Sequence, residues 1–208
     1  MVNHSVRYPT IKTMSSFAAS AAFTLATSFA MLFSLSSPSQ AAYRKLYEHD
    51  YLLQHPDALG LKIVPFKATP SHALQELRRC FNCSFPVGGA PRAYPTLGQF
   101  IPLVVCATGG FGCQKAPVKA YPTDGLYQLR LVAEPGHFDG TGSSVTFNFY
   151  TSKGGYLHLK VTGYVTSPII PDILNKAASR LVWSDFAWNL GNNMWSNTCK
   201  QGKVCGAS

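Results

Sequence analysis

The sequence lacks the short motifs that mark several common enzyme classes. It contains no Gly-x-Ser-x-Gly nucleophile elbow, no His-Glu-x-x-His zinc motif and no glycine-rich phosphate loop. Each of these motifs places a nucleophile, a metal or a phosphate in a defined local geometry. No hydrolase class is therefore indicated by motif, and the sequence leaves open whether the protein is an enzyme.

Acidic residues are also scarce, with nine Asp and Glu against eighteen Lys and Arg. None of the acids and two of the basic residues lie in residues 1–41, so residues 42–208 keep a net charge of +7. The positive charge is scattered, with short pairs only at Arg44-Lys45 and Arg78-Arg79. Diffuse charge of this kind is typical of solubility and weak attraction to anionic surfaces, so no specific nucleic-acid partner is predicted.

The N-terminal region reads as an export signal. Its first sixteen residues carry Arg7 and Lys12 and no acid, and residues 17–35 run FAASAAFTLATSFAMLFSL. Ser39-Gln40-Ala41 then fits the small-x-small pattern of a signal-peptidase site. We expect a cleavable signal peptide over residues 1–41, with cleavage near Ala41 and a secreted or periplasmic product. A retained anchor is the alternative, because about 20 apolar residues can span a bilayer.

Six cysteines follow this leader, and an even number in an exported chain predicts disulfides. They are Cys80, Cys83, Cys106, Cys113, Cys199 and Cys205. The spacing suggests one short terminal loop, Cys199 with Cys205, and a second cluster in which Cys106 pairs with Cys113. Four thiols can also hold zinc, but oxidised thiols cannot ligate a metal, so we predict no metal and no cofactor.

Residues 42–208 have the length of one domain. Their first part, residues 42–125, is rich in Pro and Gly and is expected to consist of loops, short strands and one helix, held together by its cysteines. Thr69 and Pro70 predict the start of a helix there, with apolar residues at helical spacing. Residues 101–105 read as a buried strand.

Residues 126–208 show a plainer pattern. Three apolar-rich stretches, 127–133, 145–150 and 156–165, predict strands, and the Gly-containing segment 151–155 suits a hairpin. Pro171 and Asp172 then open a helix, which Gly191 is placed to end. The apolar stripe expected on this helix comprises Leu174, Ala178, Leu181, Val182, Phe186 and Leu190. The predicted fold class is α+β, an antiparallel meander closed by a C-terminal helix.

The loop from Glu134 to Ser144 is the main candidate site. His137 with Asp139 or Glu134 would form an oriented general base, because a nearby carboxylate fixes the imidazole tautomer and raises its basicity. Loops held by a sheet commonly display such groups. The alternative is structural, since Gly, Asp, Thr and Ser are also what a turn needs.

Other side chains are candidates for binding. Trp183, Trp188 and Trp195 fit helical spacing poorly as one core stripe, so some are expected to be exposed, where they would contact lipid, glycan or a partner. Packing in the core is the alternative. His158 is expected to face away from the apolar side of its strand and becomes a binding residue if that face lines a groove. A polar cluster at His49, Asp50, His55 and Asp57 reads as a solvated segment rather than a metal site.

The stretches PGHFDGTGSSVTFNFY and GGYLHLKVTGY, with the Trp-rich helix, resemble a segment of bacterial secreted, polymorphic-toxin-like proteins. The resemblance covers the last third of the chain and implies a role for His137 alone. The order of sheet and long C-terminal helix also resembles helix-grip lipid-binding folds, in which the helix closes a hydrophobic cavity; a likeness of architecture says little about function.

Two functional hypotheses follow. The first is an exported bacterial effector or toxin-like protein of unknown substrate, with the His137 loop as its site. The second is a non-enzymatic secreted module that binds lipid, a cell-wall polymer or a partner protein. In both, the expected partner is a target cell surface, a lipid or an envelope component.

Overall fold

A computed structural model describes residues 43–56, 61–65, 67–106, 112–121 and 123–199. Residues 38–208 form one compact unit by their internal contacts. Every strand, helix and core residue described below belongs to this unit, which therefore has a hydrophobic core of its own. The predicted signal peptide and Cys205 lie outside the described residues. Within these ranges no helix combines the length and the apolar composition needed to cross a bilayer.

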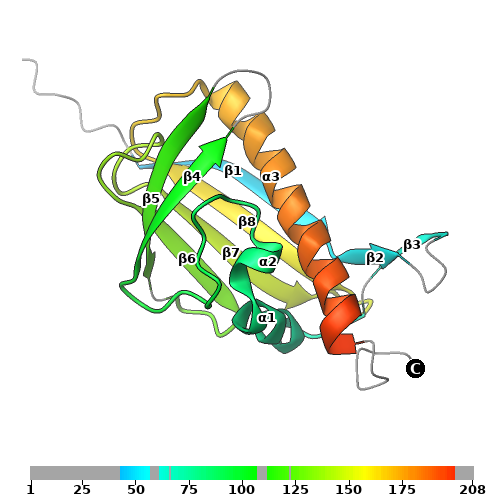
Figure 1. The fold of residues 1–208 in the computed structure, drawn as a ribbon. Coiled ribbons are helices and arrows are strands. Elements are labelled where there is room, and N and C mark those ends of the chain that lie inside the picture. Colours follow the sequence, from blue (N-terminus) through cyan, green and yellow to red (C-terminus); the bar gives the residue numbers. More distant parts are fainter. Residues whose placement is uncertain (1–42, 57–60, 66, 107–111, 122, 200–208) are drawn as a thin grey trace, which may run out of the picture. The chain divides into compact units, whose positions relative to one another are not determined.

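The main element is a six-stranded antiparallel sheet with the order β1-β8-β7-β6-β5-β4 (Figure 1). Its strands are β1 (Arg44–Leu52), β4 (Phe100–Cys106), β5 (Cys113–Tyr121), β6 (Gln128–Ala133), β7 (Ser144–Thr151) and β8 (Leu157–Val165). A short hairpin of β2 (Gln54–Pro56) and β3 (Ile63–Pro65) stands apart from this sheet. The three predicted strands of the C-terminal part are confirmed as β6, β7 and β8, and β4 confirms the strand expected over 101–105.

Alternation along the strands makes one face of the sheet apolar. In β8 every second residue from Leu157 to Val165 is buried, while His158 and Lys160 lie on the other face. Side chains alternate between the two faces of a strand, so this pattern directs one row into the core. β1, β4 and β5 extend the same sheet, so the Pro- and Gly-rich part of the chain contributes strands as well as loops.

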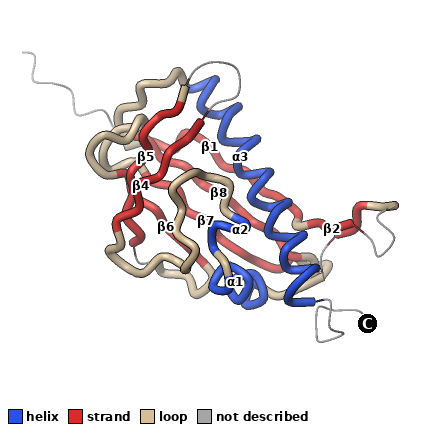
Figure 2. Tube along the Cα trace, viewed as in Figure 1, coloured by secondary structure: helices blue, strands red, loops and turns tan. Residues whose placement is uncertain are grey.

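Helices lie over the apolar face (Figure 2). They are α1 (Pro70–Arg79), α2 (Phe81–Ser84) and the long α3 (Asp172–Asn193), which continues as a π-helical turn over Met194–Cys199. Thr69 caps α1, and its backbone N–H donates to His72 Nδ1 at 3.2 Å. The α+β class, with an antiparallel sheet and a C-terminal helix, is confirmed.

Two expectations about α3 are wrong. Gly191 does not end the helix; it is buried within it, where a Cβ would lie 2.2 Å from the carbonyl oxygen of Gln54. The predicted stripe is right at Phe186 and Leu190, which are fully buried, but wrong at Leu174 and Leu181, which are 54% and 69% exposed. The buried positions of α3 are Asn175, Ser179, Trp183, Phe186, Ala187, Leu190 and Gly191.

The C-terminal half of α3 packs into a filled aromatic core. Phe186 is fully buried and meets Phe147 edge-on, with ring centroids 5.4 Å apart. Phe85, from the segment after α2, meets the same Phe186 ring at 5.3 Å. Leu190 and Met194 continue the buried row with no exposed surface. Edge-to-face aromatic pairs of this kind stabilise a fold beyond the contribution of the apolar area that they bury. This half is therefore the structural anchor of the fold.

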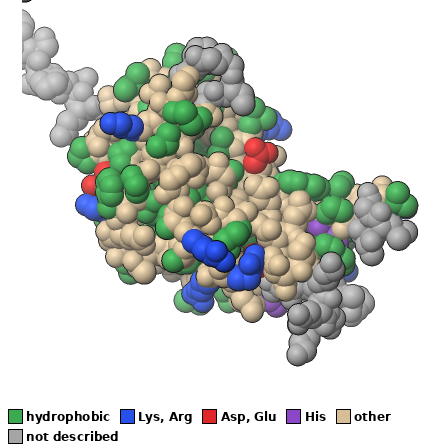
Figure 3. All heavy atoms as spheres, in the orientation of Figure 1, with side chains coloured by type: hydrophobic (Ala, Val, Ile, Leu, Met, Phe, Trp, Pro, Cys, Tyr) green, Lys and Arg blue, Asp and Glu red, His purple; other side chains and the backbone are tan. Residues whose placement is uncertain are grey.

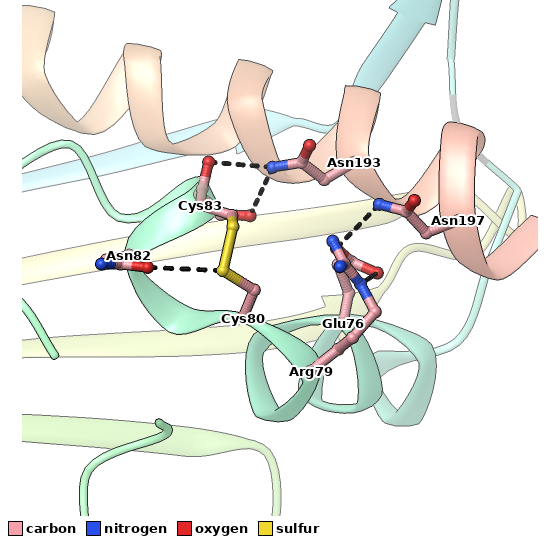
Figure 4. The surroundings of a disulfide bond; sticks show 8 residues. Glu76, Arg79, Cys80, Asn82, Cys83, Asn193 and Asn197 are labelled. Atoms are coloured by element: carbon pink, nitrogen blue, oxygen red, sulfur yellow. Dashed lines mark hydrogen bonds and ion pairs between the residues drawn. A yellow bond between two sulfur atoms is a disulfide. The ribbon is translucent and has the colours of Figure 1, made fainter. Parts of the chain in front are cut away.

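Two disulfides are present among the described residues, Cys80–Cys83 and Cys106–Cys113. Cys106 and Cys113 are paired residues of the β4-β5 hairpin, as the spacing predicted. Figure 4 shows the Cys80–Cys83 bridge beside the end of α3, where Asn193 donates to the carbonyl oxygen of Cys83 at 2.9 Å. The expected Cys199–Cys205 bridge lies outside the described residues.

Candidate binding site

A cavity of about 530 Å³ lies between the sheet and the N-terminal half of α3. Volumes of several hundred Å³ are typical of sites for small molecules. Apolar side chains supply most of its wall, from the segment after α2, from β4 to β8 and from α3. They include Phe85, Val87, Leu103, Val105, Ala116, Val118, Leu131, Val145, Val165, Val182 and Trp183. The cavity is therefore suited to an apolar guest.

The cavity opens beside the start of α3. Ile169 and Leu174 line it and are 80% and 54% exposed. Gly112 and Gln114, at the start of β5, also line it and are exposed. A wall residue with most of its surface in solvent marks a rim, so a ligand can enter between the N-terminal end of α3 and the β4-β5 hairpin.

Asp139 and Asn175 form a polar pair in the cavity wall. Asn175 Nδ2 donates to Asp139 Oδ1 at 2.5 Å, joining the loop before β7 to the first turn of α3. Burial raises the pKa of Asp139 to about 6, and the hydrogen bond from Asn175 only partly offsets it. A carboxyl in an apolar setting resists ionisation, but a pKa of about 6 still leaves Asp139 mostly ionised near neutral pH, so it is a strong hydrogen-bond acceptor facing an apolar space.

His137 lies in the same wall as a neutral imidazole. Its Nδ1 accepts the backbone N–H of Asp139 at 3.0 Å, which places the ring proton on Nε2. Burial lowers its pKa to about 4. Nε2–H is thus a neutral donor at physiological pH, and together with Asp139 it offers one donor and one acceptor to a ligand.

Hydrogen bonds to the carbonyl oxygen of Asp139 hold the loop that carries these groups. Ser143 Oγ donates to the carbonyl oxygen of Asp139 at 2.6 Å, and Ser167 N donates to that oxygen at 3.2 Å. Gly140 has a φ of +89°, and a Cβ there would lie 2.8 Å from Ser167 N. Only glycine fits such a position without strain, which explains why this loop is rich in glycine.

Trp183 and Tyr47 close the cavity toward the filled core. Trp183 Nε1 donates to the hydroxyl of Tyr47 at 3.1 Å, and burial raises the pKa of Tyr47. The Tyr47 ring crosses β8 at Gly163, where a Cβ would lie 2.3 Å from the ring. The predicted binding residue Trp183 therefore belongs to the cavity.

The remaining candidates lie elsewhere. Glu134 is outside the cavity wall and pairs with Lys119 at 3.1 Å. Trp188 is 38% exposed on the outer side of α3. His158 is on the outer face of the sheet, where its Nδ1 meets Asp50 Oδ1 at 2.9 Å and its ring stacks on Tyr150. The binding role predicted for His158 is therefore separate from the cavity.

The arrangement expected of an oriented general base differs from what the described residues show. Asp139 turns its carboxylate to Asn175, and Glu134 turns its own to Lys119. His137 has a lowered pKa, whereas a carboxylate partner would raise it. A catalytic role for His137, Asp139 and Glu134 remains a prediction.

The polar residues near the chain start are split between two faces. His49 faces α3, and its Nε2 lies 3.1 Å from Ser179 Oγ, while Asp50 faces outward. His55 stacks on Trp195, and Asp57 lies outside the described residues. Among the residues that the structure describes, no three His, Cys, Asp or Glu side chains are grouped to hold a metal.

Sequence reasoning missed Asn175 and Ser179. They are four residues apart and share the buried face of α3 with Trp183 and Phe186. The signal was present: a stripe drawn through 175, 179, 183, 186 and 190 keeps helical spacing. The competing stripe through Leu174 and Leu181 is more apolar and therefore dominates the sequence pattern.

No protein-family model matches the sequence, and no curated protein matches it. Solved structures show similarity of fold. A protein of unknown function from Staphylococcus aureus is 10% identical with a TM-score of 0.48, over 76% of this chain and 96% of that one. Ara h 8.0201 is 10% identical with a TM-score of 0.47, over 75% and 100%. An AHSA1-like protein from Aeromonas hydrophila is 9% identical with a TM-score of 0.44, over 78% and 99%. Similarity at this level carries no function over to this chain, whose fold class is established by its own strand order and helix positions.

Proposed function

We propose that this protein is a binding module for a small amphiphile, a lipid or lipid-like molecule with an apolar body and a hydrogen-bonding head. The observation that carries the proposal is the cavity of about 530 Å³, apolar in most of its lining, beneath α3. Filling such a space with an apolar guest removes hydrocarbon surface from water. Asp139 and His137 supply the acceptor and the donor that orient the head.

Binding of a neutral fluorescent probe, N-phenyl-1-naphthylamine, tests the proposal. Ala116 is buried on β5 and faces the cavity, so Ala116→Phe fills it without displacing the filled core. We expect the wild-type chain to bind the probe with blue-shifted emission and Ala116→Phe to weaken binding about tenfold or more. Ala93→Phe, the same exchange at an exposed position of the loop before β4, is the matched control.

Unchanged probe affinity in a folded Ala116→Phe variant would overturn the proposal. The melting temperature of each variant is measured beside its affinity, so that loss of fold is not mistaken for loss of the site. Ligand binding also raises the melting temperature of the wild-type chain, by an amount that grows with ligand concentration.

We also propose that the protein works outside the cytoplasm that makes it. Two disulfides support this, because such bonds persist in oxidising compartments. Intact-mass analysis of exported protein should find a chain that begins near residue 42.

A toxin-like activity centred on His137 is a separate proposal from the sequence. Loss of cell killing in His137→Ala, with an unchanged melting temperature, would support it, and unchanged killing would remove it.

A further inference from the structure

The outer side of α3 is an exposed apolar surface. Ile173 is 77% exposed, Leu181 69% and Trp188 38%. These residues, with the exposed Ala177, recur at helical spacing and lie on the side opposite Asn175 and Ser179. We call this set the outer stripe. Large apolar side chains gathered on one exposed face of a helix are typical of an interaction site.

Two cations flank the outer stripe. Lys176 and Arg180 are exposed on the same helix, one turn apart, and neither forms an ion pair among the described residues. Asp172, at the start of the helix, is already held by Arg44 at 2.7 Å. Asp185 is an exposed acid on the opposite flank. The half of α3 above the cavity thus combines apolar side chains with positive charge.

The outer stripe is continuous with the cavity rim. Ile169 and Leu174 are exposed and also line the cavity, and Ile173 lies next to Leu174 on the helix. Figure 3 shows hydrophobic side chains exposed over the upper part of the molecular face. An apolar surface that touches the rim would let a ligand leave a hydrocarbon phase and enter the cavity without crossing water.

We propose that the outer stripe of α3 docks the protein on a membrane that carries anionic phospholipids. A helix with apolar residues on one side and Lys or Arg beside them lies in the plane of a bilayer surface. Each cation near an anionic leaflet adds attraction, and Trp188 suits the head-group region. The inference rests on the proposed function in one respect, because it takes the membrane to be the source of the amphiphile that enters the cavity.

The positive charge beside the outer stripe argues against a second copy of the chain as the partner that binds there. Two outer stripes brought face to face would set Lys176 and Arg180 of each copy in one interface, where like charges oppose association. The net charge of residues 42–208, +7, adds to this repulsion and favours an anionic partner.

Vesicle co-sedimentation tests the docking. The chain from residue 42 onward is used, since it contains the compact unit with its own core, and the apolar leader would bind vesicles by itself. We expect binding to phosphatidylcholine vesicles that contain phosphatidylglycerol, weaker binding to phosphatidylcholine alone, and loss of the difference at high salt.

Matched variants locate the surface. Ile173→Gln with Leu181→Gln should weaken vesicle binding about tenfold, because two apolar side chains no longer enter the bilayer. Leu97→Gln with Leu126→Gln is the control, since these leucines are 71% and 88% exposed in loops outside α3. Lys176→Gln with Arg180→Gln should weaken binding to the anionic vesicles alone by roughly tenfold, while Lys62→Gln with Lys153→Gln should not.

The outcomes separate docking from the proposed function. Vesicle binding equal in the outer-stripe variant and in its loop control overturns docking, and so does dimerisation in solution that the outer-stripe variant abolishes. Probe binding in the cavity is read independently with Ala116→Phe. If vesicles bind through the outer stripe but the probe does not enter the cavity, docking stands and the proposed function fails.

Discussion

The two halves of α3 differ in what they turn toward the sheet. The C-terminal half buries Phe186, Leu190 and Met194 in a filled aromatic core, whereas the N-terminal half turns Asn175 and Ser179 inward over a cavity. Its leucines, Leu174 and Leu181, are largely in solvent. One helix therefore serves as an anchor at one end and as the cover of a cavity at the other.

This difference teaches how the site is built. A tightly filled half fixes the helix against the sheet, because well-packed interiors tolerate little displacement. The other half can then leave a space unfilled and carry polar groups, at a cost in stability that the anchor offsets. The same substitution should therefore lower the free energy of unfolding much more in the C-terminal half of α3 than in the N-terminal half.

The largest expected effect is a matched pair of Leu→Ala exchanges. Leu190→Ala removes a fully buried side chain and should lower the free energy of unfolding by about 3 kcal/mol. Leu174→Ala, at the half-exposed rim, should cost less than about 1 kcal/mol. Urea unfolding of both variants provides the measurement. Equal losses would show that the two halves are packed alike.

A second effect is the pH dependence caused by Asp139. Its pKa is raised to about 6 by burial, so its stabilising contribution is complete below about pH 4 and is lost as the pH rises through 6. Asp139→Asn removes this dependence and should gain up to about 3 kcal/mol relative to wild type between pH 3 and pH 8. The free energy of unfolding of both ligand-free proteins is measured across that range. If it changes with pH in the same way for wild type and for Asp139→Asn, the burial of this carboxyl is contradicted.

The smallest expected effect is that of a substitution on the outer, exposed side of α3. Leu181→Gln should change the free energy of unfolding by less than about 0.5 kcal/mol, because the side chain is 69% exposed. Thermal melts with and without vesicles are the readout. A loss of several kcal/mol without vesicles would place Leu181 in the core, as the sequence pattern first suggested.

Much of the fold was predictable from local pattern. β6, β7 and β8 show clear period-two alternation, and the start of α1 at Thr69-Pro70 and of α3 at Pro171-Asp172 follows from capping rules. β1 and β5 were missed for a physical reason. Their sequences RKLYEHDYL and CQKAPVKAY carry charged residues and a proline, and they become strands through pairing with β8, β4 and β6.

The site was predictable only in part. The loop with His137 and Asp139 stood out by composition, but its partner Asn175 lies 36 residues further along the chain. The stripe on α3 was assigned to its most apolar positions, which is right for a helix that covers a filled core. Over the cavity the buried positions include the polar residues Asn175 and Ser179 beside apolar ones, and only the tertiary structure reveals which half of the helix has which role.

A crystal structure with 10-bromodecan-1-ol tests the central claim most directly, because the anomalous signal of bromine fixes both the position and the direction of the ligand. The account predicts bromine among the apolar side chains of β4 and β5, near Leu103 and Ala116, and the hydroxyl beside Asp139 and His137. An unoccupied cavity at saturating ligand, or bromine only on the protein surface, would contradict it.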